Sequence, residues 1–211
     1  MDLFTVGHSN HPIEPFISLL QQHGVTALAD VRSHPHSRHL PHFNKAELTA
    51  ALESQGIRYV FLGKELGARS GNPACYVEGK AVYEKIAATD EFQAGLQRVI
   101  SGLQTYNIAL MCAEQDPLTC HRAILVCHHL KPFNLTINHI LKTGELESHD
   151  QLESRLLSKQ GFTEFADPTA PVQLSLFSNN LPSREDCLEE AYKRQGDEIA
   201  YVEKQGGSDR G

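Results

Sequence analysis

Residues 108–122 read Ile-Ala-Leu-Met-Cys-Ala-Glu-Gln-Asp-Pro-Leu-Thr-Cys-His-Arg. The apolar run 108–111 has the length and composition of a buried strand. Asp116 and Pro117 then supply the cap and the first turn of a helix. The stretch therefore predicts a strand followed by a helix, with a polar loop at the carboxyl end of the strand.

The same alternation extends along the chain in both directions. Apolar runs predict strands at 3–6, 25–31, 58–62, 108–111 and 135–141, and helical spacing predicts helices at 12–24, 44–56, 82–103, 116–132 and 150–160. Strands joined through helices need crossover connections, which give a mainly parallel sheet. We expect an α/β domain over residues 1–163, with a mainly parallel open sheet flanked by helices (doubly wound, Rossmann-like).

Residues 164–211 differ from this body in composition. Ten acidic and five basic residues give them a charge of −5, and the first 163 residues carry the remaining −2 of the net −7. All twelve histidines lie at or before His149. We expect an acidic, flexible and partly disordered tail with a possible short helix at 184–204. This charge does not fit a protein that holds DNA by counterion release alone.

The composition also indicates a compartment. No apolar run reaches transmembrane length, and residues 1–4 lack the basic start of a secretory signal. The five cysteines do not form an even framework for disulfides. We expect a cytoplasmic protein with reduced thiols and no membrane partner.

Three polar clusters follow predicted strands, at residues 7–10, 30–38 and 112–122. Ligands of open parallel sheets bind beyond the carboxyl ends of the strands. We therefore expect the three clusters to form one site.

These clusters carry motifs that resemble the domain of unknown function 488 family. The motifs are Gly7-His8-Ser9, Asp30-Val31-Arg32 with Pro35 and Arg38, Leu66-Gly67-Ala68-Arg69, Cys112-Ala113-Glu114, and Cys120-His121-Arg122. The resemblance runs from about residue 3 to about residue 146 and leaves out the tail. It implies the fold and the location of the site, and it carries no reaction.

Arginines and backbone donors in these clusters suit an anion. The predicted substrate-binding residues are Ser9, Arg32, Arg38, Arg69 and Arg122, whose forked or hydroxyl donors match phosphate oxygens. The alternative gives Arg32 and Arg122 to buried ion pairs with Asp30 and Glu114.

Proton-transfer groups and thiols lie beside them. The predicted catalytic residues are Asp30 and Glu114 as acid or base, His8 and His121 as imidazoles, and Cys120 as a thiol activated at a helix start. A carboxylate at a strand end can instead cap a helix, and the cysteines can instead be packing residues.

Two metal interpretations remain open at this point. Cys112, Cys120 and His121, with His8, could hold zinc, although their spacing lacks a Cys-x-x-Cys pair. The histidines at 34, 36, 39 and 42 could also hold a metal, but a loop at the pocket mouth fits their prolines better. The glycine-rich stretch 63–79 suits a lid or binding loop.

The tail contains Gln173-Leu174-Ser175-Leu176-Phe177, which resembles the sliding-clamp-binding motif of bacterial DNA polymerases and repair proteins. Prolines and asparagines on both sides leave its apolar side chains without a local partner. Docking into the groove of a bacterial DNA sliding clamp explains this pattern, and the alternative is that the segment folds back on its own body.

Together these features predict a clamp-tethered protein of DNA repair, modification or replication-linked processing. We expect hydrolysis or transfer at a nucleotide or nucleic-acid group in an arginine-lined pocket. The alternative is a non-catalytic adaptor that senses a nucleotide or a DNA end.

Overall fold

The structure is a computed structural model that describes residues 1–165 and 181–203. The pentapeptide 173–177 lies outside the described residues. The strands are β1 Asp2–Gly7, β2 Ala27–Asp30, β3 Arg58–Phe61, β4 Tyr76–Val77, β5 Lys80–Ala81, β6 Ile108–Cys112, β7 Thr136–Ile140 and β8 Leu146–Ser148. The α-helices are α1 Ile13–Gln22, α2 Lys45–Glu53, α3 Gly63–Leu66, α4 Tyr83–Ala87, α5 Asp90–Gly102, α6 His128–Leu130, α7 His149–Lys159 and α8 Arg184–Ile199, with a π-helical segment at Arg122–Cys127.

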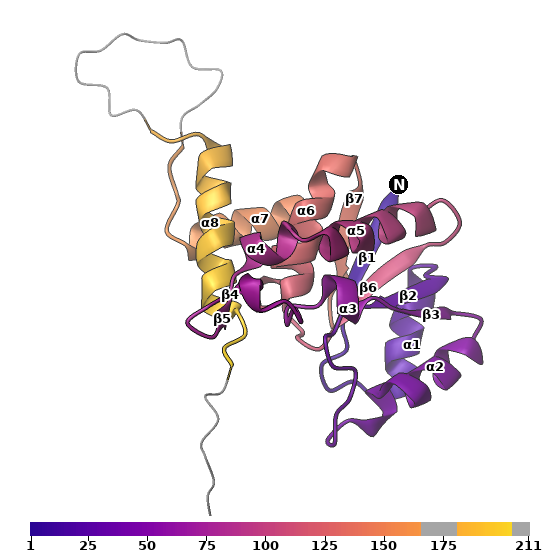
Figure 1. The fold of residues 1–211 in the computed structure, drawn as a ribbon. Coiled ribbons are helices and arrows are strands. Elements are labelled where there is room, and N and C mark those ends of the chain that lie inside the picture. Colours follow the sequence, from indigo (N-terminus) through magenta and orange to yellow (C-terminus); the bar gives the residue numbers. More distant parts are fainter. Residues whose placement is uncertain (166–180, 204–211) are drawn as a thin grey trace, which may run out of the picture.

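One sheet organises these elements. Its strand order is β3-β2-β6-β1-β7-β8, and all neighbours pair in parallel except the antiparallel edge strand β8. Helices cover the sheet, as Figure 1 shows. The mainly parallel α/β fold expected from the sequence is confirmed.

The two faces of the sheet bury separate cores because successive strand residues point to opposite sides. On one face, Phe16 of α1 and Leu48 of α2 pack with Val6 of β1. On the other face, Phe92 of α5 and Leu125 of the π-helical segment pack with Leu110 of β6. The helix after β1 and the segment after β6 therefore lie on opposite faces.

Two predicted helices are interrupted in the structure. The helix expected over 82–103 is split into α4 and α5, because the Thr89 side chain accepts a hydrogen bond from the Phe92 amide and starts a new helix. The helix expected over 116–132 consists of a 3₁₀ turn at Pro117–Thr119, the π-helical segment and α6. Because no α-helix runs on from Asp116, the residues just before Cys120 form a separate 3₁₀ turn, and Cys120 itself is extended.

Helix α8 belongs to the folded body. Its residues Cys187, Leu188, Ala191 and Tyr192 are buried in the core that contains Phe92 of α5 and Leu110 of β6. The Gln195 side chain donates to the Leu118 carbonyl across 2.9 Å. The part of the acidic tail expected to form a helix is thus packed on the body, and it supports the loop after β6.

Among the helices of residues 1–165 and 181–203, none combines the length and the apolar character that crossing a bilayer requires.

Candidate metal centre

The site lies where β1 and β6 end side by side. Gly7 of β1 pairs with Cys112 of β6, and the chain leaves these two strands toward opposite faces of the sheet. Such a point opens a crevice beyond the carboxyl ends of the strands. Cys112 and Glu114 lie at this crevice.

Four side chains of this region form one compact group. One ligand atom from each of Cys112, Glu114, Cys120 and His121 can be chosen so that all four atoms lie within 4.8 Å of one another. Oε2 of Glu114 is 3.1 Å from Sγ of Cys112 and 3.0 Å from Sγ of Cys120. Glu114 is exposed as a residue, but its carboxylate reaches both thiols. Two sulfurs, an imidazole nitrogen and a carboxylate oxygen are ligand types that zinc prefers.

A hydrogen bond to the backbone fixes the orientation of the His121 ring. Nε2 lies 3.0 Å from the Val31 carbonyl, which can only accept, so Nε2 carries a proton. Nδ1 lies on the side of the thiols, 3.5 Å from Sγ of Cys112. Burial acts to lower the pKa of His121, but the hydrogen bond and the charge of Cys120 outweigh it and raise this pKa above its usual value. Imidazoles that bind a metal usually donate their other nitrogen to a carbonyl or a carboxylate in this way.

The two thiols differ in their ionisation. Burial, the hydrogen bond with Cys120 and nearby negative charge hold the pKa of Cys112 well above its usual value. Burial acts in the same direction on Cys120, but the Cys112 hydrogen bond and the charge of Arg122 outweigh it and place the pKa of Cys120 well below its usual value. Burial and the charge of Cys120 raise the pKa of Glu114. One thiolate is thus available within the group.

Arg122, which follows His121 in the chain, is fully buried next to the Cys112–Glu114–Cys120–His121 group. Its guanidinium donates to the carbonyls of Glu114 and Gln115, across 2.6 Å and 3.0 Å, and its backbone amide donates to Sγ of Cys120 across 3.5 Å. The expected ion pair between Arg122 and the Glu114 carboxylate is absent from these contacts. Arg122 holds the loop after β6, and it does not reach the solvent.

A glycine allows this loop to approach β1. A Cβ atom built on Gly7 would lie 1.9 Å from the Glu114 carbonyl oxygen. Any larger residue would push away the loop that carries Glu114.

The polar groups at the ends of β1 and β2 form a separate buried cluster. Arg32 donates two side-chain hydrogen bonds to the Asp30 carboxylate, at 2.9 Å and 2.7 Å, and a third to the Phe43 carbonyl. Tyr59 adds a 2.8 Å hydrogen bond to Asp30. The expected buried pair of Asp30 with Arg32 is present, and Asp30 is fully covered.

His8 completes this cluster as a neutral imidazole. Nδ1 donates to the Ser9 carbonyl across 2.9 Å, and Nε2 accepts from Arg32 across 3.1 Å. Burial, together with the charge of Arg32, lowers the pKa of His8 to about 4. His8, Asp30 and Arg32 therefore shape the crevice beside the thiol group.

A cavity of about 410 Å³ opens above the Cys–Glu–Cys–His group. It is lined by Arg32, Ser33, His34, His36, Ala68, Arg69, Tyr83, Cys112, Ala113, Glu114, Thr119, His121, Ile199 and Tyr201. Cys120 lies behind this lining and is 1% exposed. His34 and His36 are at the cavity, as expected for a loop at the pocket mouth.

Several predicted residues lie elsewhere. Arg38 is exposed outside the lining, and Ser9 adopts a left-handed backbone conformation (φ 43°) with its hydroxyl 3.5 Å from the Gln115 side chain. Asp116 caps the turn Pro117–Thr119 by accepting a hydrogen bond from the Leu118 amide, and it pairs with Arg155 at 2.8 Å, so its carboxylate already has a cation. Of the arginines expected to hold phosphate, Arg69 is the exposed one at the cavity.

Sequence reasoning missed the aromatic walls of the cavity. Tyr83 begins α4, and Tyr201 follows α8, where the chain pairs with the β4–β5 hairpin through the Ala81 amide and the Tyr201 carbonyl. The Arg69 guanidinium lies 4.2 Å from the centre of the Tyr201 ring. Burial raises the pKa of Tyr83, and the charges of Cys120 and Cys112 raise it further. Only the packing of α8 on the body brings Tyr201 here, and no local sequence signal marks it.

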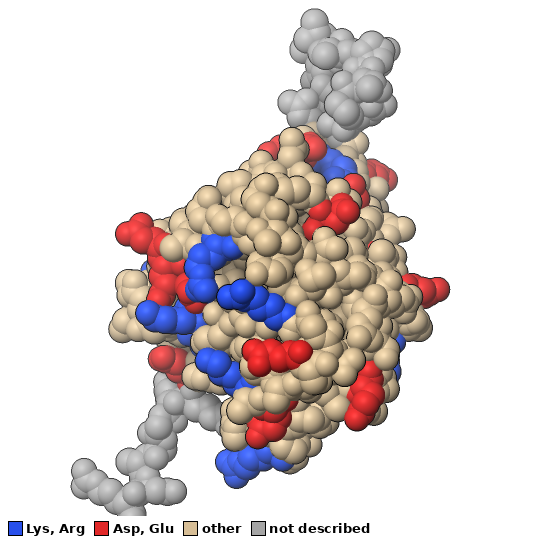
Figure 2. All heavy atoms as spheres, turned by 90° about the vertical axis from the view of Figure 1, so that its right-hand side faces the viewer, with Lys and Arg blue, Asp and Glu red and all other residues tan. Residues whose placement is uncertain are grey.

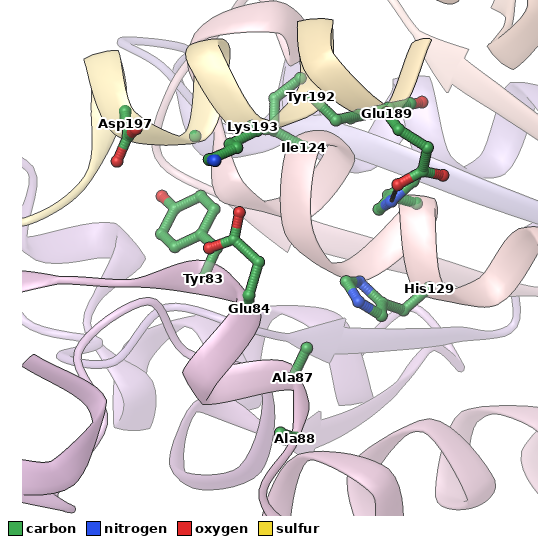
Figure 3. A pocket seen from close by; sticks show the side chains of 12 residues that line it. Tyr83, Glu84, Ala87, Ala88, Ile124, His129, Glu189, Tyr192, Lys193 and Asp197 are labelled. Atoms are coloured by element: carbon green, nitrogen blue, oxygen red, sulfur yellow. Dashed lines mark ion pairs between the residues drawn. The ribbon is translucent and has the colours of Figure 1, made fainter. Parts of the chain in front are cut away.

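Tyr83 also lines a second cavity, of about 340 Å³, between α4, α8 and the π-helical segment. Figure 3 shows Glu84 beside Tyr83, facing Lys193 and Asp197 of α8 across this space. Its lining has both charges and contains no thiol. The metal-ligating side chains therefore belong to the first cavity.

A chain of buried hydrogen bonds leads from Arg122 to α8. Arg122 Nε donates to Thr5 (3.3 Å), and the chain continues through His139 (2.7 Å), His149 (3.0 Å), Tyr192 (2.9 Å) and Glu153 (3.0 Å). Burial lowers the pKa of His139 and of His149, which favours the neutral form of each. With both histidines neutral, Arg122 only donating and the Glu153 carboxylate accepting, each proton in between has one consistent position.

Comparisons with known proteins give one match. A family model described as a domain of unknown function, DUF488, matches residues 12–128. No curated protein and no solved structure matches the chain.

Proposed function

Because this chain belongs to the DUF488 family, whose description assigns no reaction, we propose from its own residues that it is a zinc-dependent hydrolase acting on a nucleotide or nucleic-acid group. Cys112, Cys120 and His121 are the proposed zinc ligands, and Glu114 is the proposed acid/base. Recruitment to the bacterial sliding clamp through residues 173–177 is part of this proposal.

The compact Cys112–Glu114–Cys120–His121 group at the base of a cavity carries the proposal. Catalytic zinc sites typically use three protein ligands and leave one position for water, whose pKa zinc lowers to about 7. Nδ1 of His121, which lies 3.5 Å from Sγ of Cys112, and the two thiols suit the three ligands once zinc displaces their protons. Glu114 is then within reach of the remaining position and can take a proton from the water.

The charges around the group support zinc. Two thiolates and a carboxylate carry three negative charges, and zinc with the buried Arg122 supplies three positive charges. Burying such a set is costly unless its charges are matched and hydrogen-bonded. The Arg122 amide and the Val31 carbonyl supply hydrogen bonds to Cys120 and His121.

The substrate class rests on the cavity mouth and the tail. Exposed Arg69 offers a forked donor for a phosphate at the mouth. Figure 2 shows Lys and Arg side chains gathered in part on one side of this face and scattered elsewhere, with Asp and Glu side chains among them, so that face has no broad basic surface. Tethering by the pentapeptide would supply the local concentration that weak contacts to DNA do not.

The experiment measures zinc in the purified full chain and in two cysteine variants. We expect about one zinc per chain, with loss of most of it in Cys120→Ser and no loss in Cys187→Ser, a buried thiol of α8. Zinc should slow alkylation of Cys112 and Cys120, and a chelator should reverse this protection. A wild-type protein that binds no zinc would overturn the proposal.

The role of Glu114 separates an enzyme from an adaptor. Glu114→Gln should retain zinc and ligand binding and lose turnover by a factor on the order of 10²–10⁴. A variant that keeps the cellular function of the wild type would support the non-catalytic adaptor instead.

A further inference from the structure

The ligand set separates two kinds of hydrolysis. Enzymes that cleave phosphate esters commonly use two metal ions about 3.5–4 Å apart, held by hard ligands. Within residues 1–165 and 181–203, the Cys112–Glu114–Cys120–His121 group is the one cluster with metal-ligand geometry. Its two sulfurs suit a single soft-ligated zinc. This arrangement favours attack on a carbon centre over attack on phosphorus.

The charge at the base of the cavity also favours attack on a carbon centre over attack on phosphorus. Two thiolates neutralise the charge of one zinc ion, and the charge of the buried Arg122 balances that of Glu114, so no net positive charge remains at the base to attract a phosphate. Arg32 and Arg122 also have no free donors for a phosphate, because Asp30 and the loop carbonyls already occupy their guanidinium groups. A phosphate is better placed near Arg69 at the mouth, and a neutral group is better placed at the base.

The walls of the cavity suit a flat ring. Tyr83 and Tyr201 line it, and the Arg69 guanidinium lies over the Tyr201 ring. Aromatic side chains and arginine planes stack on nucleobases without reading their sequence. A cavity of about 410 Å³ is in the size range of small-molecule sites and can take a nucleotide.

We propose that this site removes the exocyclic amino group of a nucleobase by hydrolysis. The inference rests on the proposed zinc-dependent function and names its substrate class and reaction. One His, two Cys and a Glu that is not a ligand form the set with which zinc enzymes deaminate nucleobases. Here His121, Cys112 and Cys120 would hold the zinc, and Glu114 would move the protons.

The reaction balances without any further reactant. Water adds through its oxygen to the ring carbon that bears the amino group, so a C–O bond forms. Glu114 takes one proton from the water and passes it to the neighbouring ring nitrogen. The proton that remains on the added hydroxyl then moves through Glu114 to the leaving amino group. The C–N bond then breaks, ammonia leaves, and a carbonyl replaces the amino group, with no oxidation or reduction.

The experiment uses the zinc-loaded full chain and four substrates. These are a single-stranded oligonucleotide containing cytosine, adenine and guanine, the same sequence as a duplex, the free nucleotides of these bases, and a thymine-only strand. Ammonia release and the mass of the product are measured. We expect ammonia in equal amount to the converted base from the strand or the free nucleotides, which also distinguishes these two sources. Thymine, which has no exocyclic amino group, should release none.

Matched variants assign the activity to the site. Glu114→Gln should lower ammonia release by a factor on the order of 10²–10⁴ while keeping its zinc. Glu47→Gln, an exposed residue of α2, should react like wild type.

The outcomes separate this inference from the function on which it rests. A protein that binds zinc and releases no ammonia from any substrate overturns the deamination proposal. If the same protein cleaves the oligonucleotide instead, the zinc-dependent hydrolase stands and deamination falls. A protein that binds no zinc overturns both the deamination proposal and the proposed zinc-dependent hydrolase.

Discussion

Tyr192 of α8 donates its hydroxyl hydrogen to Glu153 of α7 across 3.0 Å. Its oxygen also accepts from Nε2 of His149 across 2.9 Å. Lys131 and Arg184 pair with the same Glu153 carboxylate. One buried hydroxyl thus joins α8 to the hydrogen-bond chain that ends at Arg122. Arg122 in turn donates its backbone amide to Sγ of Cys120 in the Cys–Glu–Cys–His group.

Removing this hydroxyl should loosen α8. Tyr192→Phe leaves a buried donor on His149 and one fewer donor to Glu153, and an unsatisfied buried polar group costs about 1–3 kcal/mol. Urea denaturation should show this loss. Tyr106→Phe is the control, because the Tyr106 hydroxyl accepts from Arg58 at the exposed surface and its loss should cost under about 1 kcal/mol. Equal losses in the two variants would contradict a structural role for the buried chain.

Acid should destabilise the metal-free protein through its buried neutral histidines. Burial lowers the pKa of His8 to about 4, of His128 to about 3 and of His149 to about 4, in each case as the largest cause. The unfolded chain binds these protons near pH 6.5 and the folded chain does not. The free energy of unfolding should therefore be fully retained above about pH 6.5 and fall toward pH 4, by up to about 1.4 kcal/mol per pH unit for each histidine.

One variant tests the contribution of a single histidine to this pH dependence of the unfolding free energy. His149→Gln removes one titrating group, so its unfolding free energy should depend on pH less steeply than that of wild type by about one proton. The exposed His39→Gln should keep the wild-type slope. Urea denaturation at several pH values measures both, and equal slopes for His149→Gln and wild type would count against a neutral buried His149.

The contact between β1 and the loop after β6 gives a third prediction. Gly7→Ala places a methyl group 1.9 Å from the Glu114 carbonyl oxygen before any relaxation. Overpacking of this kind costs about 1–3 kcal/mol. Displacing Glu114 should also weaken zinc binding. Gly71→Ala is the matched control, because a Cβ there meets no atom within 4 Å. Unchanged stability and zinc content in Gly7→Ala would show that the loop yields freely.

The strands and most helices could be predicted because their signals are local. Apolar runs mark the strands, whereas the break between α4 and α5 was missed although Thr89 followed by acidic residues is a local capping signal. The π-helical segment could not be predicted, because its apolar run Ala123–Cys127 has no local feature that separates a π-helix from an α-helix. The packing of α8 on the body could not be predicted either, because it depends on contacts between residues far apart in the sequence, such as Tyr192 with His149 and Glu153.

The sequence identified the residues of the candidate site but not their arrangement in space. The zinc interpretation of the sequence grouped Cys112, Cys120 and His121 with His8, whereas in the structure the fourth member of the group is Glu114, whose carboxylate reaches both thiols. The turn at Pro117–Thr119 makes this possible, because it brings Cys120 back toward Cys112. Arg32 and Arg122 looked like ligand-binding residues because a sequence does not show which charges are already paired.

The last prediction concerns residues 173–177, for which the sequence is the only guide. Leu176 and Phe177 are adjacent apolar groups with Leu174 two residues before Leu176, and such anchors suit a preformed groove on the clamp. Pro168 and Pro171 limit the freedom that docking would remove. Losing both large anchors should remove on the order of 3–5 kcal/mol, which abolishes a micromolar contact.

The measurement is titration of the bacterial sliding clamp against wild type and the double variant Leu176→Ala with Phe177→Ala. Leu181→Ala removes an exposed leucine just beyond the motif and should bind like wild type. The double variant should keep the wild-type melting temperature, because docking on a partner leaves the body unchanged. A lowered melting temperature would instead indicate that these side chains pack on their own body. Absence of wild-type binding at tens of micromolar, or equal binding by the double variant, would refute recruitment through this segment.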